Sequence, residues 1–348
     1  MSPYVLMILL SSLGLGTTLT FMSSHWLLAW MGLEINTLAI LPLMAQHHHP
    51  RAVEATTKYF LAQAAAAATI LFASTINAWM VGEWNIYCLS HPIATTLIMM
   101  ALALKVGLAP VHFWMPPVMQ GLDLTTGLIM ATWQKLAPFA LIIQVAPFMH
   151  PQLFITLGLL SVLIGGWEGL NQTQLRKILA YSSIAHLGWM IVIVQFKPQL
   201  TILALITYII MTSATFLTFK SLHSTKINTL AMNWTKMPTI TTIATLALLS
   251  LGGLPPLTGF MPKWLIMQEL TTQNLPLTAT IMALSALLSL YFYLRLCYSM
   301  TLTTSPNTNN SLTPWRLHNM QNMIPLATFT TMTLLLLPLT PLVQALIN

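Results

Sequence analysis

Four ionisable side chains lie in the middle of long apolar stretches of this chain: Glu34, Lys105, Lys135 and Lys263. Buried carboxyl and amino groups can take up and release protons near neutral pH. Each charge costs about 2.5–3.5 kcal/mol at the centre of a bilayer, so the four would forfeit roughly 10 kcal/mol if they faced lipid. We therefore expect all four to face the interior of a helix bundle and to be kept there for a function.

We expect Glu34 to pair with Lys105, because both lie in the first half of the chain. A pair that can separate would pass a change of charge along a proton path, whereas a fixed structural ion pair is the alternative. Lys135 lies about ten residues from either predicted interface, too far for its side chain to reach water, so we interpret it as a relay. For Lys263 an interfacial position with the amine reaching water remains an alternative.

Two histidines belong to the same hypothesis. His112 follows the proline-rich interruption after Lys105, and His186 lies in the middle of another apolar stretch. A neutral imidazole can pass a proton through its two nitrogens, although a hydrogen-bonded core histidine is an equally good reading of each. The tract at positions 47–49 is three consecutive histidines, which we interpret as a solvated loop rather than a metal site.

Composition places the chain in a membrane. Of its 348 residues 56% are hydrophobic and only 5% are charged, whereas a soluble domain has about 25% charged residues. The net charge of +7 is scattered rather than clustered, which argues against nucleic-acid binding. Two cysteines cannot hold an iron–sulfur cluster, and no glycine-rich nucleotide motif is present, so we expect no cofactor in this chain.

The fold class predicted is all-α, a polytopic membrane protein of about eleven transmembrane helices. Apolar runs separated by polar or proline-rich breaks give the spans 3–21, 26–44, 56–81, 92–121, 124–145, 151–172, 175–195, 199–222, 239–272, 276–298 and 323–346. The stretches 223–238 and 299–322 are predicted to be the longest loops. Lysine and arginine collect on the side that holds the N-terminus, which the positive-inside rule makes the inner side, with the C-terminus opposite.

An internal repeat divides the chain into two halves. Gly107-Leu108-Ala109-Pro110 with Trp114-Met115-Pro116 matches Gly253-Leu254-Pro255-Pro256 with Phe260-Met261-Pro262 at identical spacing. Proline breaks or kinks a helix, so a broken helix is expected near 105–117 and another near 252–262. The second copy lies in the fifth span after the first, which predicts inverted bundles over 1–145 and 146–298, followed by a loop and a final helix over 299–348.

Several long strings resemble a known family, the antiporter-like membrane-arm subunits of mitochondrial NADH–ubiquinone oxidoreductase (respiratory complex I), in the short animal form. The resemblance covers essentially the whole chain, and it is carried by SSHWLLAWMGLEINTLAILP, KYFLAQA, LALKVGLAPVHFWMP, TWQKLAP, GGWEGLNQTQLRKILAYSSIAHLGWM and LGGLPPLTGFMPKW. Glu168 stands where that family often has a small or apolar residue.

The resemblance implies a proton-translocating subunit. It implies that Glu34 pairs with Lys105, that Lys135 is the central relay and Lys263 the last one, and that His112 and His186 lie along the same path. NADH, FMN, iron–sulfur clusters and ubiquinone would belong to other subunits. Its partners would be other membrane-arm and accessory subunits and lipids such as cardiolipin, in the mitochondrial inner membrane with the N-terminus in the matrix and the C-terminus in the intermembrane space.

Two other functions remain open at this point. The chain could be a stand-alone cation/proton antiporter, since such antiporters share this fold. It could also be mainly a structural link in the membrane arm, with its charges unused. The cost of keeping four buried charges argues against the structural reading.

Overall fold

Proline marks the start of most of the long helices. The computed structural model describes residues 2–46, 48–235, 237–302 and 323–347, and within them helices are the regular structure, with β-pairing confined to isolated bridges. Proline has no N–H to lose in the first turn, and its fixed φ suits that position. This is why the third helix begins at Pro50, earlier than the predicted residue 56.

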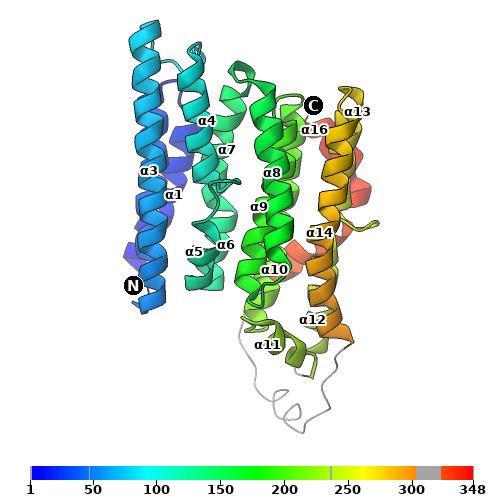
Figure 1. Ribbon diagram of the computed structural model, residues 1–348. Coiled ribbons are helices and arrows are strands. Elements are labelled where there is room, and N and C mark those ends of the chain that lie inside the picture. The colour runs from blue at the N-terminus through cyan, green and yellow to red at the C-terminus, as the bar shows by residue number, and fades with distance from the viewer. Residues whose placement is uncertain (1, 47, 236, 303–322, 348) are drawn as a thin grey trace. The chain divides into compact units, whose positions relative to one another are not determined.

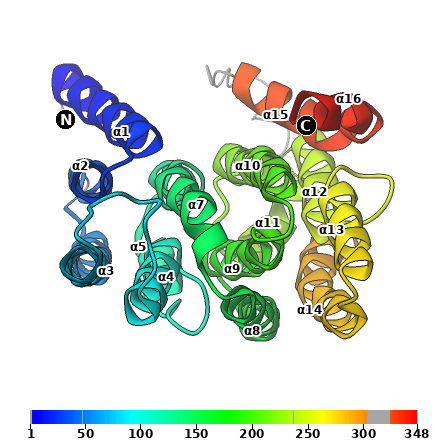
Figure 2. The same ribbon diagram turned by 90° about the horizontal axis from the view of Figure 1, so that it is seen from above.

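The chain forms two compact units, residues 1–161 and 162–348. The first unit contains α1 (Pro3–Met22), α2 (Trp26–Met44), α3 (Pro50–Val81), α4 (Pro92–Val106), α5 (Met115–Gly121), α6 (Leu124–Ala131), α7 (Trp133–Val145) and the start of α8 (Pro151–Gly169). Figure 2 shows α1, α2, α3 and α4 following one another around α7, which contacts α1, α2 and α4.

The second unit continues with α9 (Leu175–Ile193), α10 (Pro198–Ser221), α11 (Ile227–Ala231), α12 (Pro238–Gly252), α13 (Phe260–Thr272), α14 (Pro276–Thr301), α15 (Ile324–Leu335) and α16 (Thr340–Ile347). Its core is built on α9 and α10: α9 contacts α10, α13 and α14, and α10 contacts α12 and α15 (Figure 1). The predicted loop at 223–238 contains α11 and a short 3-10 turn, and most of the loop predicted at 299–322 lies outside the described residues.

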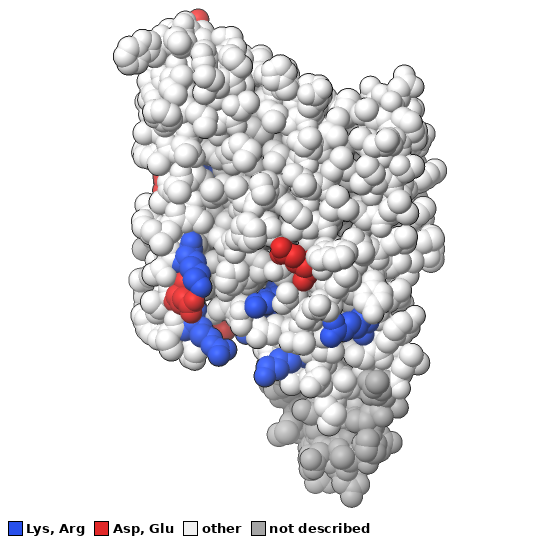
Figure 3. Space-filling model, viewed as in Figure 1, with Lys and Arg blue, Asp and Glu red and all other residues white. Residues whose placement is uncertain are grey.

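Seven helices among the described residues are long and apolar enough to cross a membrane: α1, α2, α3, the segment 124–148, α8, α10 and α14. The pair formed by α15 and the segment after it makes an eighth if it is counted as one span, and it is bent by 66° beside the turn that contains Pro338. The other predicted spans correspond to α9 and to the interrupted pairs α4–α5 and α12–α13, whose halves are short. Most of the surface in Figure 3 carries no charged side chain, as a chain surrounded by apolar material requires.

Candidate functional site

Both expected helix interruptions are present, and they have the same backbone. In the first unit α4 ends at Val106 and is capped by Gly107, whose φ is +86°, and α5 begins at Met115. In the second unit α12 ends at Gly252 and is capped by Gly253, with φ +78°, and α13 begins at Phe260. Glycine takes this left-handed conformation without a steric penalty, which explains its place at both ends. A cis peptide bond precedes the same proline of each repeat, Pro110 and Pro256.

The first interruption exposes the last carbonyl groups of α4, and side chains satisfy two of them. The indole Nε1 of Trp114 donates to the carbonyl oxygen of Leu104 at 2.9 Å. The amide Nε2 of Gln63, from α3, donates to the carbonyl oxygen of Lys105 at 3.3 Å. Unpaired carbonyl groups at a helix end inside a membrane are costly, so these two donors make the break tolerable.

The second interruption satisfies its carbonyl group with a lysine. Nζ of Lys263, from α13, donates to the carbonyl oxygen of Gly252 at 2.8 Å, and the side chain is buried. This places the amine at the carboxyl end of α12, where the helix dipole favours a cation. Thr258 in the break donates to the carbonyl oxygen of Thr333 in α15 at 2.7 Å, which ties the interruption to a neighbouring helix.

Glu34 and Lys105 form the expected pair. Glu34 Oε1 lies 4.0 Å from Lys105 Nζ, and the two side chains are 22% and 1% exposed. This distance is too long for a hydrogen bond, and neither atom has a hydrogen-bond partner among the described residues. The other carboxylate oxygen accepts a hydrogen bond of 3.2 Å from Thr37. The charges therefore attract each other without being locked together.

Lys135 lies just after a helix interruption that was not predicted from the sequence. The predicted span 124–145 is divided at Thr132, whose φ of −112° and ψ of −69° separate α6 from α7. Lys135 is 3% exposed and occupies the first turn of α7. Pro138 lies farther along, inside α7, where it has no N–H for the carbonyl group of Gln134. No glycine or proline stands at Thr132 itself.

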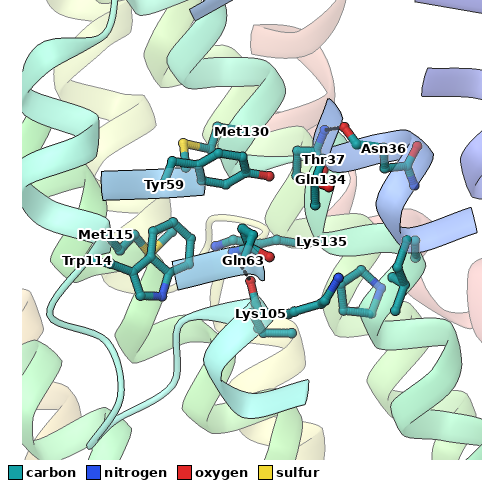
Figure 4. Close-up of a pocket in the computed structure, with 14 residues that line it drawn as sticks. Asn36, Thr37, Tyr59, Gln63, Lys105, Trp114, Met115, Met130, Gln134 and Lys135 are labelled. Atoms are coloured by element: carbon teal, nitrogen blue, oxygen red, sulfur yellow. Dashed lines mark hydrogen bonds between the residues drawn. The ribbon is translucent and has the colours of Figure 1, made fainter. Parts of the chain in front are cut away.

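Lys105 and Lys135 share one cavity in the first unit (Figure 4). Its volume is about 20 Å³, counted as the space open to the centre of a water molecule, which is enough for about one water. The lining combines apolar residues with polar and aromatic side chains from α2, α3, the break and α7, among them Asn36, Thr37, Tyr59, Gln63, Trp114 and Gln134. A small cavity lined in part by polar side chains can bring proton donors and acceptors within reach of each other.

The two histidines occupy different units. His112 is 1% exposed and lies within the first interruption, where its carbonyl oxygen accepts a hydrogen bond from the N–H of Met115. His186 is half-buried in α9, and its ring centroid lies 5.7 Å from that of Tyr208 on α10. The first unit thus holds Glu34, Lys105, His112 and Lys135, and the second holds His186 and Lys263.

The remaining ionisable groups lie nearer the helix ends. Glu54 pairs with Lys58 one turn along α3, and both are exposed. Glu269 lies 3.7 Å from Lys197 and accepts a hydrogen bond from Gln273. In the tract of three histidines, His49 caps α3 by accepting from the N–H of Arg51, while position 47 lies outside the described residues. These roles are those of surface and capping groups.

Comparison with known families covers nearly all of the chain. Residues 23–289 match the family described as NADH:quinone oxidoreductase/Mrp antiporter, TM, and residues 290–344 match the NADH dehydrogenase subunit 2 C-terminus. NADH-ubiquinone oxidoreductase chain 2 of Carassius auratus is 73% identical over 346 residues, which is 99% of each chain. The protein of the same name from Oncorhynchus mykiss is 70% identical over 347 residues, covering 100% of this chain and 99% of the relative.

Solved structures share the fold. A chain of respiratory complex I from Thermus thermophilus, solved with bound aureothin, has a TM-score of 0.88 and 28% identity, covering 99% of this chain and 80% of its own. A chain of the Mrp complex from Dietzia has a TM-score of 0.85 at 17% identity, covering 97% of this chain and 76% of its own. At 17% identity the similarity concerns the fold alone.

Proposed function

This chain belongs to the NADH-ubiquinone oxidoreductase chain 2 family, and from that membership we propose that it carries protons across the membrane as a core subunit of the membrane arm of complex I. The energy comes from oxidation of NADH by ubiquinone. As a membrane-spanning subunit of that oxidoreductase it would lie in the mitochondrial inner membrane, with the N-terminus in the matrix, the C-terminus in the intermembrane space, and protons moving from the matrix outward.

The observation that carries the proposal is the arrangement around Lys105. This lysine faces Glu34 across 4.0 Å on one side and shares a cavity with Lys135 on the other. A positive charge on Lys135 would disfavour the charged form of Lys105 by repulsion. A stronger attraction between Glu34 and Lys105 would instead favour the charged form of Lys105. At 4.0 Å the two charges of the Glu34–Lys105 pair interact, and because no hydrogen bond joins them the distance between them can change.

Three further residues belong to the proposed proton path. In the first unit His112 lies in the same break, and to it we add His186 and Lys263 of the second unit as proposed members of the path. We assign NADH, FMN, the iron–sulfur clusters and ubiquinone to other subunits of the complex, because this chain offers no nucleotide motif and only two cysteines. Partners are then other membrane-arm and accessory subunits, with surrounding lipids such as cardiolipin. The division into two bundles, 1–145 and 146–298, followed by 299–348, remains part of the same proposal.

The test is proton stoichiometry. The Lys135→Ala variant in the assembled complex, reconstituted in liposomes, should pump fewer protons per electron while NADH oxidation by ubiquinone continues. Normal assembly with the full stoichiometry would refute the proposal and favour a structural role.

A stand-alone cation/proton antiporter is the second candidate, because the match extends to the Mrp antiporter family. Reconstitution of the isolated chain in liposomes distinguishes the two. Proton flux driven by a sodium or potassium gradient, without other subunits, would favour the antiporter, whereas a complex I subunit should show none.

A further inference from the structure

Gln63 is a polar residue in a strongly apolar part of α3. It is followed by five consecutive alanines, and its side chain is only 4% exposed. Burying an amide in such surroundings is unfavourable unless it makes hydrogen bonds, so its position needs an explanation. The explanation lies at the broken end of α4, which α3 packs against.

The hydrogen bond of Gln63 fixes the orientation of its amide. Nε2 donates to the carbonyl oxygen of Lys105 at 3.3 Å. Because a carbonyl oxygen can only accept, the nitrogen must point to Lys105, which leaves Oε1 as a hydrogen-bond acceptor. Gln63 also lines the cavity that Lys105 and Lys135 share (Figure 4). The side chain of Gln63 thus contacts the backbone of Lys105 and lines the same cavity as Lys135.

A second residue of α3 supports the same end of α4. Tyr59 lies one helical turn before Gln63, so both side chains share a face of the helix. The ring of Tyr59 packs at 5.7 Å from that of Trp114, whose indole donates to the carbonyl oxygen of Leu104. Two successive carbonyl groups of α4 are therefore held by side chains that α3 supplies or braces.

Comparison of the two interruptions shows what Gln63 makes possible. In the second one the lysine itself satisfies the free carbonyl group, since Lys263 donates to Gly252. In the first, neutral donors from Gln63 and Trp114 do so, and Nζ of Lys105 is left without a hydrogen bond among the described residues. The amine of Lys105 is therefore available to Glu34 and to the cavity.

We propose that Gln63 is a positioning residue for proton transfer, which holds the backbone of Lys105 so that its amine can move between Glu34 and the cavity beside Lys135. The proposal rests on the proposed proton-carrying function. Without this anchor the last turn of α4 would fray, and the distances from Lys105 to Glu34 and to Lys135 would vary.

The first experiment removes the donor. Gln63→Leu keeps the volume but cannot donate, so in the assembled complex in liposomes its protons per electron should fall most of the way to the value of Lys135→Ala measured beside it. Gln144→Leu is the matched control, since Gln144 is a half-buried glutamine of α7 outside the cavity, and it should retain the wild-type stoichiometry.

The second experiment tests positioning against mere space filling. A glutamic acid at position 63 donates only while protonated, so Gln63→Glu should pump nearly normally at low pH and lose pumping as the pH rises. The titratable groups around this position are Tyr59 of α3, Glu34 of α2, Lys105 of α4 and Lys135 of α7. They are present in the wild type too, so the variant must show an inflection that the wild type and Gln144→Glu lack.

The outcomes separate the two proposals. If Lys135→Ala loses stoichiometry while Gln63→Leu keeps it, or if Gln63→Glu shows no new inflection, the role of Gln63 is refuted and the proposed function stands. If Lys135→Ala itself pumps normally, the proposed function fails. Loss in Gln63→Leu together with the pH-dependent recovery in Gln63→Glu supports the positioning role.

Discussion

The amine of Lys263 donates a hydrogen bond of 2.8 Å to the carbonyl oxygen of Gly252, the last residue of α12. Either protonation state of a lysine retains an N–H for this bond, so the amine can exchange a proton without releasing the helix end. The same contact can therefore support the fold and take part in proton transfer. Substitutions that keep one role and remove the other can separate the two.

Lys263→Arg should separate them. A guanidinium keeps N–H donors for the carbonyl group of Gly252 but stays charged at every accessible pH. We expect the complex to assemble and to oxidise NADH, with fewer protons pumped per electron, as measured in liposomes. Lys197→Arg, at the partly exposed pair with Glu269, is the control and should pump normally. Normal pumping by Lys263→Arg would remove Lys263 from the path.

Glu34→Gln should weaken pumping while sparing assembly. The amide oxygen can still accept the hydrogen bond of Thr37, but the counter-charge of Lys105 is gone. Removing one partner of a fully buried pair costs about 3–5 kcal/mol, and less is expected here because 22% of the Glu34 side chain is exposed. Protons per electron should fall, and a further Lys105→Met change should add little to that loss. Glu54→Gln, in an exposed pair, should leave stoichiometry unchanged.

Gly259→Ala should prevent the second interruption from forming. A Cβ atom at this position would collide with the carbonyl oxygen of Ser250, which is backbone and cannot move aside freely. Overpacking of this kind costs about 1–3 kcal/mol or more, so the amount of assembled complex on native gels should drop. Gly14→Ala is the control, since a Cβ there meets nothing within 4 Å, and assembly should be normal.

The thiol of Cys88 should react slowly at neutral pH. A hydrogen bond to the side chain of Glu83, partial burial and the negative charge of Glu83 raise the pKa of this thiol above its usual value. A higher thiol pKa means less thiolate at a given pH, so alkylation by iodoacetamide should become fast only at more alkaline pH than for a free cysteine. Glu83→Gln should shift the profile toward lower pH, as mass spectrometry of the labelled peptide can measure. An unchanged profile would contradict the contact. Cys297 is buried and should contribute little.

Apolar runs and prolines identify most of the helices from sequence. Prolines at helix starts and the repeated G-L-x-P element locate α4, α5, α12 and α13 to within a few residues. Such features act locally, through φ and a missing N–H, so the sequence alone contains them. No glycine or proline stands at Thr132, so no local feature of the sequence predicts the break there.

The charged residues of the site could be predicted from the sequence, but the residues that hydrogen-bond to the end of α4 could not. Burial cost alone singles out Glu34 and the three lysines, since a charge in an apolar run is costly wherever the helix packs. The donors of Gln63 and Trp114 reach across from another helix or across the break, and their partners depend on tertiary packing. The predicted pairing of Glu34 with Lys105 matches the observed 4.0 Å separation, while the roles assigned to these residues remain to be tested.

Lys105 comes before the first break in the sequence, whereas Lys263 comes after the second. When the repeats are aligned through Gly107 and Gly253, Lys105 falls opposite Leu251 and Lys263 opposite Pro117. An alignment would therefore leave both lysines unmatched. In space each lysine belongs to the carboxyl end of the helix that precedes its break, one within the last turn and the other reaching back to it. The two halves are therefore alike in where their lysine amines lie, at the carboxyl end of the helix before each break, and a residue-by-residue alignment does not show this likeness.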